Sequence, residues 1–249
     1  MNTCIRIKDV EKVFNTAEGL KFTALDKINL DVDKNDFICI IGPSGCGKST
    51  LLRIIAGLEK TSYGKIYYLD NELDKPTKDI GMVFQNYSLL PWKTVIDNIG
   101  LGLEFSGMKK SKRDIIAKRY LDMISMKEFE KSYPHELSGG MQQRVAIARA
   151  LANDPEVLLM DEPFGALDAY TRILLQRELL KIWGKNKKTI LFVTHSVDEA
   201  IYLSDKIVVM SSNPGKIKEV IKVDMERPRE RSNPKFGVLT EKLLNMLEE

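Results

Sequence analysis

Hydrophobic and polar residues follow two patterns along the chain, and each pattern predicts a different kind of strand. Before residue 36, short apolar and polar runs alternate between turn residues, which predicts antiparallel strands over residues 3–35. Later runs are continuously apolar, as is typical of strands covered on both faces of a parallel sheet. These runs occupy residues 37–41, 157–160, 189–193 and 206–210. Further strands are predicted at residues 64–71, 80–84 and 216–223.

In the segments between these strands, apolar residues recur at helical spacing. They predict helices over residues 49–56, 95–125, 138–150, 168–183 and 197–203, and one more at the C-terminus. Within residues 95–125, one face carries Ile116, Tyr120, Met123 and Ile124. One face of the C-terminal helix carries Phe236, Leu239, Leu243 and Leu247, and we expect this face to dock the helix.

The alternation of strands and helices in the second half of the chain predicts an α/β fold. We expect a core with a mostly parallel sheet, an antiparallel β subdomain at the N-terminus and an inserted helical subdomain. The whole chain, residues 1–249, is expected to form a single domain. Its core lobe then comprises residues 1–86 and 156–249, and its helical subdomain comprises residues 87–155.

Charge gives little support to a nucleic-acid-binding function. The chain has 249 residues, and its net charge of +3 is too small to indicate nucleic acid by itself. Lysines and arginines gather between positions 109 and 119, on the faces of the predicted helix that are not apolar. They form either a nucleic-acid contact or a solvated helix face, and the second interpretation is favoured. We therefore expect no nucleic-acid partner.

Cysteine usage and hydropathy narrow the cellular setting. Cys4, Cys39 and Cys46 do not have the spacing of a disulfide framework or a zinc site, so a reducing compartment fits. No apolar run approaches the ~20 residues that span a bilayer, and the N-terminus lacks the apolar core of a signal peptide. We expect a soluble chain that reaches a membrane only through a partner.

A glycine-rich segment lies between the strand predicted at residues 37–41 and the helix predicted at residues 49–56. It matches the pattern G-x-x-x-x-G-K-[ST] at every fixed position. Its residues are Gly42, Pro43, Ser44, Gly45, Cys46, Gly47, Lys48, Ser49 and Thr50. Glycines let backbone N–H groups turn inward around phosphate oxygens, and a helix start adds partial positive charge. The segment therefore predicts a nucleotide site, in which Lys48 reaches the β- and γ-phosphates and Ser49 contacts Mg²⁺.

Two acidic residues end the apolar run that begins at residue 157. A phosphate loop needs an acid at the end of a nearby strand to hold Mg²⁺, and Asp161 is placed for that. Glu162 beside it has either of two interpretations. It is a general base that deprotonates a water for attack on the γ-phosphorus, or it is a solvated loop acid.

A second candidate anion site begins the helix predicted at residues 138–150. Ser138 stands at a natural N-cap, and the backbone N–H groups of Gly139 and Gly140 follow it at the helix start. Taken alone, such a serine and glycine pair is usually a turn.

With these three motifs, essentially every predicted element of the chain resembles the ATP-binding subunit of an ABC transporter. Residues 42–50 resemble Walker A of that family, and residues 157–161 resemble Walker B, followed by Glu162 as the catalytic glutamate. Residues 137–142 resemble the family signature, with Met141 where glutamine is commoner. The resemblance implies a P-loop NTPase core.

Four further residues match the family's pattern one by one. Gln85 is similar to the Q-loop glutamine, Asp168 closes a run that resembles the D-loop, and His195 is similar to the switch histidine. Phe14 falls where the family has an aromatic that stacks on adenine, although an aromatic in a strand is often a core residue. The implied catalytic residues are Glu162, His195, Gln85 and Lys48. The implied ligands of Mg²⁺ are Ser49, Gln85 and Asp161, and the implied nucleotide contacts are Phe14, residues 42–50, Ser138, Gly139, Gly140 and Asp168.

The resemblance also implies partners. In this family the signature motif completes the nucleotide site of the opposite subunit, so we expect a two-fold dimer around two MgATP. We expect it on the cytoplasmic face of the cell membrane, bound to a separate permease and served indirectly by a solute-binding protein. Residues 90–92, 137–151, 213–217 and 227–229 are similar to the importers of nitrate, sulfonates and taurine. Tyr87, Leu89, Leu90 and Trp92 form either the permease contact or a loop folded back on the helical subdomain.

Three other functions compete with a transport ATPase. A soluble ABC protein of translation control generally carries two cassettes in one chain, and 249 residues hold one. An ABC ATPase of chromosomes or DNA repair needs a long coiled-coil insertion, and no sustained heptad run is present. A small-molecule P-loop kinase shares Walker A but gives Ser138 and His195 no function. Co-purification with a membrane protein, rather than with ribosomes or DNA, separates the first two from the transport ATPase.

Overall fold

The computed structural model describes residues 3–15, 19–165 and 167–248. The described residues gather into two compact units. The first lies within Met1–Thr77 and Ile182–Glu249, and the second within Lys78–Lys181. The lobe boundaries expected after residues 86 and 155 stay a prediction.

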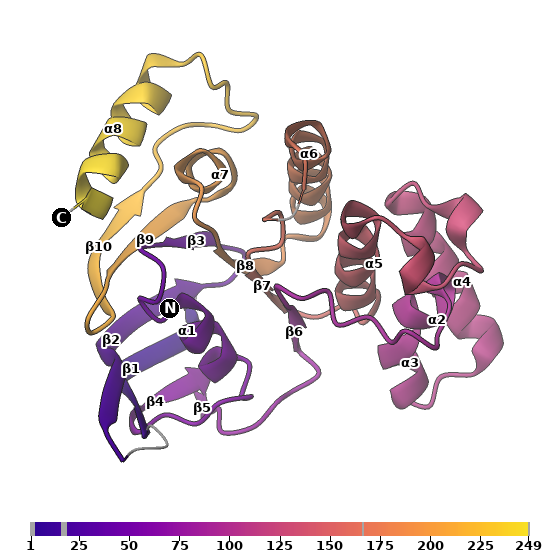
Figure 1. Cartoon of the computed structure of the whole chain (residues 1–249), viewed down its shortest axis with the longest axis horizontal. Helices are drawn as coiled ribbons and strands as arrows, with labels where there is room; N and C mark the ends of the chain where they lie inside the picture. Colours follow the sequence, from indigo (N-terminus) through magenta and orange to yellow (C-terminus); the bar gives the residue numbers. More distant parts are fainter. Residues whose placement is uncertain (1–2, 16–18, 166, 249) are drawn as a thin grey trace. The chain divides into compact units, whose positions relative to one another are not determined.

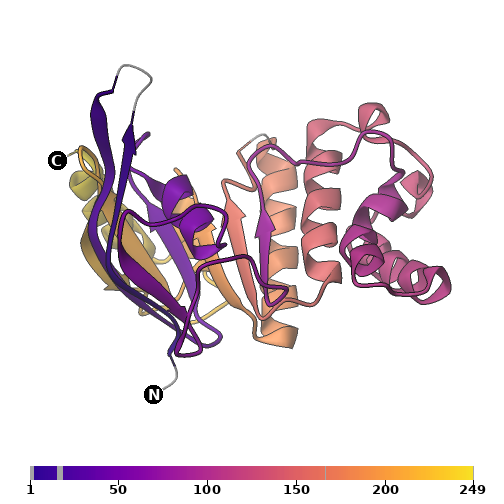
Figure 2. The same cartoon turned by 90° about the horizontal axis from the view of Figure 1, so that it is seen from below.

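The N-terminal part of the first unit is a four-stranded antiparallel sheet. Its strands are β1 (Thr3–Asn15), β2 (Lys21–Asp33), β4 (Tyr63–Tyr68) and β5 (Asn71–Glu72), in the order β2-β1-β4-β5. Figure 2 shows β1 and β2 as a long hairpin. In β1, Ile5 and Ile7 are buried, whereas Arg6 between them is only half-buried. This alternation belongs to a sheet with one covered face, and the predicted antiparallel strands are confirmed.

The first unit also contains the strand that leads into the glycine-rich segment. This strand, β3 (Phe37–Ile41), pairs in parallel with β8 (Thr189–Val193) and with β9 (Lys206–Ser211). β10 (Lys216–Lys222) is antiparallel to β9. Every residue of β3 and β8 is buried, which explains why both segments are continuously apolar apart from Thr189.

Three helices cover these strands. Figure 1 shows α1 (Lys48–Ile55) and α7 (Val197–Leu203) on opposite faces of the strands, and α8 (Pro234–Glu248) packs beside α7 and β9. Phe236 and Leu243 of α8 are buried, and Leu239 and Leu247 on the same face are half-buried. The predicted docking face of the C-terminal helix is therefore confirmed.

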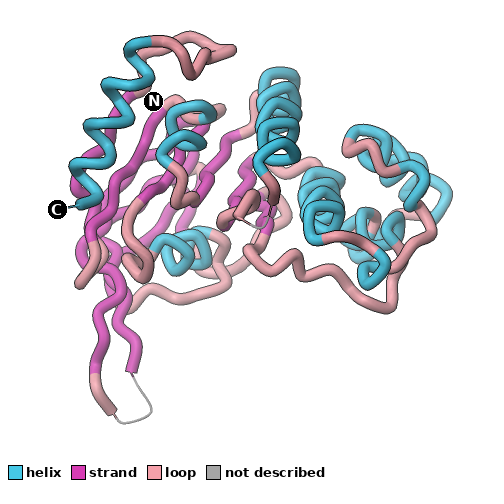
Figure 3. The backbone as a smooth tube through the Cα atoms, turned by 45° about the horizontal axis from the view of Figure 1, so that its top comes forward, coloured by secondary structure: helices cyan, strands magenta, loops and turns pink. Residues whose placement is uncertain are grey.

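The second unit is mostly helical, as the colours of Figure 3 show. Its strands are β6 (Ile80–Val83) and β7 (Val157–Asp161), which pair in parallel. Its helices are α2 (Val95–Ile99), α3 (Leu101–Phe105), α4 (Lys110–Met123) and α5 (Gly139–Ala152), with 3-10 turns at Lys127–Phe129 and Pro134–Glu136. α6 (Ala169–Asn186) begins in this unit and ends in the first. The helices α2, α4 and α5 share one apolar core with the segment that joins α4 to α5.

The region predicted as helix from residue 95 to 125 is three helices rather than one. The chain breaks at Gly100, which caps α2, and at Gly107, whose φ of +76° belongs to the left-handed region that favours glycine. In α4 the fully buried residues are Ala117 and Leu121, so the apolar face is displaced by one position from the predicted one. Among the helices in the described ranges, none combines the length and apolar composition needed to cross a bilayer.

Candidate functional site

The glycine-rich segment forms a tight loop between β3 and α1 in the first unit. Gly45 and Gly47 have φ of +77° and +93°, which L side chains rarely adopt. Gly47 is the N-cap of α1 and has no side chain to accept a hydrogen bond from the first helical N–H groups. The first turn of α1 also contains no acidic residue. The start of this helix is therefore suited to an external anion.

Lys48 lies inside the loop. Its side chain is buried, and its ammonium donates to the carbonyl oxygens of Gly42 and Pro43, each at 2.8 Å. These contacts hold the charge against the loop backbone, where the sequence predicted a phosphate contact. Ser49 and Thr50 follow in the first turn of α1 and are half-buried.

Close backbone packing explains why the loop needs its glycines. A Cβ at Gly47 would lie 2.6 Å from Leu25 Cδ2, and a Cβ at Gly42 would lie 2.7 Å from the carbonyl oxygen of Met210. A Cβ at Gly215 would meet the carbonyl oxygen of Cys46 at 2.1 Å. Gly215 therefore packs directly against the backbone of the loop, a function that the sequence analysis did not identify.

Two other predicted residues belong to the same unit. Phe14, near the end of β1, is 37% exposed, and the Lys12 ammonium lies 4.7 Å from the centre of its ring. Its exposed ring is more accessible than that of a core residue, as the predicted stacking on adenine requires. His195 follows β8 and is exposed.

The turn that carries His195 is held by its neighbours. The Thr194 hydroxyl donates to the Glu199 carboxylate at 2.5 Å, and the same hydroxyl oxygen accepts from the backbone N–H of Ser196 at 3.0 Å. Ser196 is the N-cap of α7, since its hydroxyl accepts from the N–H of Glu199. The residues on both sides of His195 are thus tied to the first turn of α7.

The second unit brings Gln85 and Glu162 together. Gln85 follows β6, Glu162 follows β7, and the Gln85 Nε2 donates to the Glu162 Oε2 at 3.1 Å. Asp161, the last residue of β7, is buried. Glu162 has a φ of +47°, an unusual backbone conformation for a residue with a side chain. Strained residues of this kind cluster at functional sites, which favours a general base over a solvated loop acid.

The predicted signature forms the start of α5, as expected. Ser138 is the N-cap, and its hydroxyl accepts from the N–H of Met141 at 3.3 Å. A Cβ at Gly139 would lie 3.1 Å from the Tyr87 hydroxyl, and a Cβ at Gly140 would lie 3.2 Å from Leu167 Cδ2. The two glycines therefore let the signature lie against the segment after Gln85 and against the D-loop.

Asp168 precedes α6. Its carboxylate accepts from the N–H of Thr171 at 3.0 Å, and hydrogen bonds from Thr171 lower the pKa of Asp168. The side chain therefore caps the helix start as an anion. Ala166, in the same predicted D-loop, lies outside the described residues.

A cleft of about 830 Å³ opens within the second unit. Its lining includes Gln85, Tyr87, Leu89, Pro91, Gln143 and Glu162. Gln143 is 2% exposed, and its Nε2 has no hydrogen-bond partner among the described residues. A buried amide in that state favours an additional acceptor in the cleft.

Arg149 and Asn98 hold the segment after Gln85, and the sequence analysis missed both. Arg149 of α5 donates to the carbonyl oxygens of Tyr87 and Ser88 at 2.8 and 2.6 Å, and burial lowers its pKa. The fully buried Asn98 accepts from the N–H of Leu90 and donates to its carbonyl oxygen. The signal was a polar residue on an otherwise apolar helix face. These contacts are to backbone atoms, which no side-chain pattern identifies.

The apolar residues of this segment divide between the two expected arrangements. Leu89 packs against the helical core and Leu90 is half-buried, whereas Trp92 is 71% exposed. Part of the segment therefore folds back onto the helices, and the tryptophan stays accessible.

The predicted site residues fall in both units. The first unit contains Phe14, residues 42–50 and His195, and the second contains Gln85, Ser138, Gly139, Gly140, Asp161, Glu162 and Asp168. A family model described as ABC transporter matches residues 25–165, a range that includes the segments predicted as Walker A, Walker B and the signature. The chain belongs to the ABC transporter ATPases.

The sequence of this ATPase matches those of known relatives over nearly all of its length. It is 54% identical over 249 residues to an uncharacterized ABC transporter ATP-binding protein of Methanocaldococcus jannaschii, covering 100% of this chain and 93% of that protein. It is 48% identical over 244 residues to the aliphatic sulfonates import ATP-binding protein SsuB of Bacillus cereus, covering 98% of this chain and 96% of that protein.

A solved structure confirms the predicted fold. The dimeric structure of a post-hydrolysis state of the ATP-binding cassette MJ0796, bound to ADP and Pi, matches with a TM-score of 0.82 and 34% identity. The match covers 89% of this chain and 100% of that chain. The chain is thus an ABC-type ATPase with an α/β core, mixed sheets and a helical subdomain.

We expect Gly47→Ala to destabilise this ATPase by about 3 kcal/mol, because the added Cβ meets Leu25 while the backbone is left-handed. Gly45→Ala is the matched control, since its φ is similar but a Cβ there has nothing within 4 Å. It should lose only about 1 kcal/mol from backbone strain. Urea unfolding without nucleotide measures both variants. Equal losses would contradict the packing explanation.

Proposed function

We propose that the chain is the ATP-hydrolysing subunit of an importer, that it dimerises around two MgATP, and that it powers uptake of a small solute through a separate permease. One observation carries the proposal. The chain has a second glycine-flanked helix start, at Ser138, that is exposed in addition to the phosphate loop. A kinase that shares only the phosphate loop needs no such feature. In a two-fold dimer each Ser138 completes the partner's nucleotide site.

Within this proposal the site residues divide the chemistry among themselves. Lys48 and the first N–H groups of α1 bind the β- and γ-phosphates. Glu162 takes a proton from the attacking water. Gln85 donates a hydrogen bond to the Glu162 carboxylate and thereby orients that carboxylate. His195 contacts the γ-phosphate from the turn before α7, and Phe14 stacks on the adenine.

The residues present suit a magnesium ion. Ser49, Asp161 and Gln85 offer a hydroxyl, a carboxylate and an amide oxygen, which are the hard ligands that Mg²⁺ prefers. Mg²⁺ is usually held by one or two carboxylates together with substrate phosphates, and a dedicated protein cage is unnecessary. When bound, the ion neutralises charge on the phosphate oxygens during phosphoryl transfer.

Two similarities support the dimer and the class of solute. The cassette MJ0796 is dimeric in its complex with ADP and Pi. The relative from Bacillus cereus is named for aliphatic sulfonate import, and the match between the two proteins covers 98% of this chain. We therefore propose an organic sulfonate or a related oxyanion as the solute, taken up from a solute-binding protein at the outer face of the membrane.

The cleft of the second unit and Trp92 form the proposed permease contact. Tyr87, Leu89 and Pro91 line the cleft, and the buried Gln143 amide can donate to a backbone carbonyl of an inserted segment. Gln85 is the first residue of the same segment and donates to Glu162. A movement of the permease can therefore reach the catalytic Glu162 through this one loop. In this proposal the ATPase works on the cytoplasmic face of the membrane.

Glu162→Gln should bind ATP, but its rate of hydrolysis should fall by a factor of about 100 or more. The amide keeps the shape of the side chain and cannot take a proton. Trapped MgATP should then hold two chains together. Size-exclusion chromatography with MgATP measures the shift from monomer to dimer, with ADP as the control. A variant that retains ATP and stays monomeric would argue against the sandwich.

Ser138→Arg should leave ATP binding by isolated chains nearly unchanged and abolish hydrolysis, since Ser138 serves the partner's nucleotide. Mixing it with Lys48→Ala chains sharpens the test. One composite site then carries both lesions and the other carries neither, so activity returns if one site suffices. Loss of ATP binding by the Ser138→Arg monomer would refute the assignment across the dimer.

Trp92→Ala should weaken binding to membranes that contain the permease and leave the ATPase activity and stability of the isolated chain unchanged, because the side chain is 71% exposed. Leu89→Ala is the control, since Leu89 packs on the helical core and its loss lowers stability. Membrane flotation and thermal unfolding measure the two effects. A drop in melting temperature for Trp92→Ala that matched its loss of membrane binding would contradict docking.

A further inference from the structure

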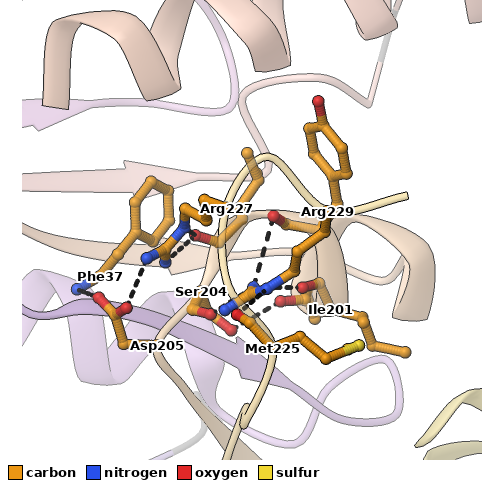
Figure 4. Close-up of polar contacts among 10 residues, drawn as sticks. Phe37, Ile201, Ser204, Asp205, Met225, Arg227 and Arg229 are labelled. Atoms are coloured by element: carbon orange, nitrogen blue, oxygen red, sulfur yellow. Dashed lines mark hydrogen bonds and ion pairs between the residues drawn. The ribbon is translucent and has the colours of Figure 1, made fainter. Parts of the chain in front are cut away.

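The segment between β10 and α8 contains three arginines at alternate positions, and all three lie against α7. They are Arg227, Arg229 and Arg231. Figure 4 shows the first two with their guanidinium groups directed at the C-terminal end of α7 and the residues that follow it. The function proposed above uses none of them.

Arg229 closes the C-terminal end of α7. The last carbonyl groups of a helix have no partner within the helix and carry partial negative charge. Arg229 Nη1 donates to the carbonyl oxygens of Ile201 and Ser204 at 2.5 and 2.6 Å, and Nε donates to that of Met225 at 3.0 Å. The residue is 6% exposed. Burial, and to a smaller extent the Arg227 charge, lowers the pKa of Arg229 to about 10, so the group stays charged at neutral pH.

Arg227 joins the same helix end to the start of β3. Its Nη2 and Nε donate to the carbonyl oxygen of Leu203 at 2.5 and 3.2 Å, and its Nη1 pairs with Asp205 at 2.5 Å. The other carboxylate oxygen of Asp205 accepts from the N–H of Phe37 at 2.9 Å. The guanidinium also lies 4.5 Å from the ring of Trp183. The helix end is therefore fixed to the sheet.

Arg231 holds the other end of α7. Its Nε and Nη2 donate to the two carboxylate oxygens of Asp198 at 2.6 and 2.7 Å, and these bonds raise the pKa of Arg231. Asp198 lies in the first turn of α7. The guanidinium also lies 4.3 Å from the ring of Tyr202, one turn further along. A two-bond pair of this geometry fixes orientation as well as distance.

The fixed helix carries the turn that contains His195. α7 has seven residues, and a helix of that length is not stable in water without outside contacts. Its first turn is tied to Thr194 by Glu199 and begins at the N-cap Ser196. Displacement of α7 therefore displaces both neighbours of His195.

We infer that Arg227, Arg229 and Arg231 are positioning residues for ATP hydrolysis, because they clamp both ends of α7 and thereby fix the location of His195. This rests on the proposed function, in which His195 contacts the γ-phosphate. Small displacements of a positioned group lower the rate strongly. The hydrogen bonds of the clamp described above go to α7, to Ser204 and Asp205 just after it and to Met225, rather than to the phosphate loop or Phe14. The clamp therefore acts on kcat rather than on the KM for ATP.

Two variants of the full-length chain test the inference. Arg231→Glu sets two carboxylates against each other at an exposed position, and Arg229→Lys keeps the buried charge but loses the planar fork. We expect kcat to fall about tenfold with a KM for ATP within twofold of the starting value. Adding Asp198→Arg to Arg231→Glu restores opposite charges and should recover most of kcat. Arg6→Ala, which removes an ion pair with Asp31 elsewhere in the unit, is the matched control.

A second readout is independent of activity. The chain has two histidines, so the imidazole NMR spectrum contains two sets of signals. His135 lies in the second unit, where its ring stacks on Tyr133. We expect both clamp variants to shift or broaden the His195 signal and to leave the His135 signal unchanged. Arg6→Ala should change neither signal.

The same substitutions in a His195→Ala variant distinguish failure of this inference from failure of the proposed function. There the clamp substitutions should lower kcat by less than twofold, because the side chain that they position is gone. An equal fall in kcat on both backgrounds, or an unchanged His195 signal in the folded variants, would overturn the inference. Full activity of His195→Ala itself would instead refute the proposed contact with the γ-phosphate. The NMR signals would then still decide whether the three arginines position the His195 side chain.

Discussion

Strands that are covered on both faces have room for polar side chains only where they end. β3, β7 and β8 are buried at every position, and each is followed directly by residues assigned to the chemistry. The phosphate loop follows β3, Asp161 and Glu162 stand at the end of β7, and Thr194 and His195 follow β8. Burial of the strands thus decides where nucleotide can be bound, because the strand interiors exclude every ionised group.

Helix ends complete what the strand ends begin. α1 starts at a glycine and α5 at a serine followed by two glycines, so both starts leave backbone N–H groups accessible to phosphate. α7 also starts at a serine N-cap, but unlike α1 and α5 it has two acidic residues, Asp198 and Glu199, in its first turn. Its opposite end receives two guanidinium groups. In the proposed function, helix polarity therefore acts in two ways: partial positive charge binds nucleotide, and partial negative charge binds the protein's own arginines.

Motifs made of consecutive residues could be predicted, and contacts made across the sequence could not. The strand, glycine loop and helix around Lys48 are local, so their order in the sequence already defines their geometry. The N-cap at Ser138 was predicted for the same reason. In contrast, Arg149 and Gly215 act on the backbone of distant segments, and the sequence around each residue does not identify those segments. The break of the predicted long helix at Gly107 needed a backbone angle that composition does not specify.

The partners of Arg229 have a consequence for how mutations accumulate. Among the described residues, its guanidinium donates to main-chain oxygens of α7, of Ser204 just after it and of its own segment, and every residue type supplies such an oxygen. A change of side chain within α7 therefore leaves the acceptors of Arg229 in place as long as the helix itself is kept. The arginine has no such freedom, since a shorter or neutral side chain leaves several buried carbonyl groups unsatisfied. At this contact, a change of side chain in α7 should consequently be tolerated better than a change of the arginine.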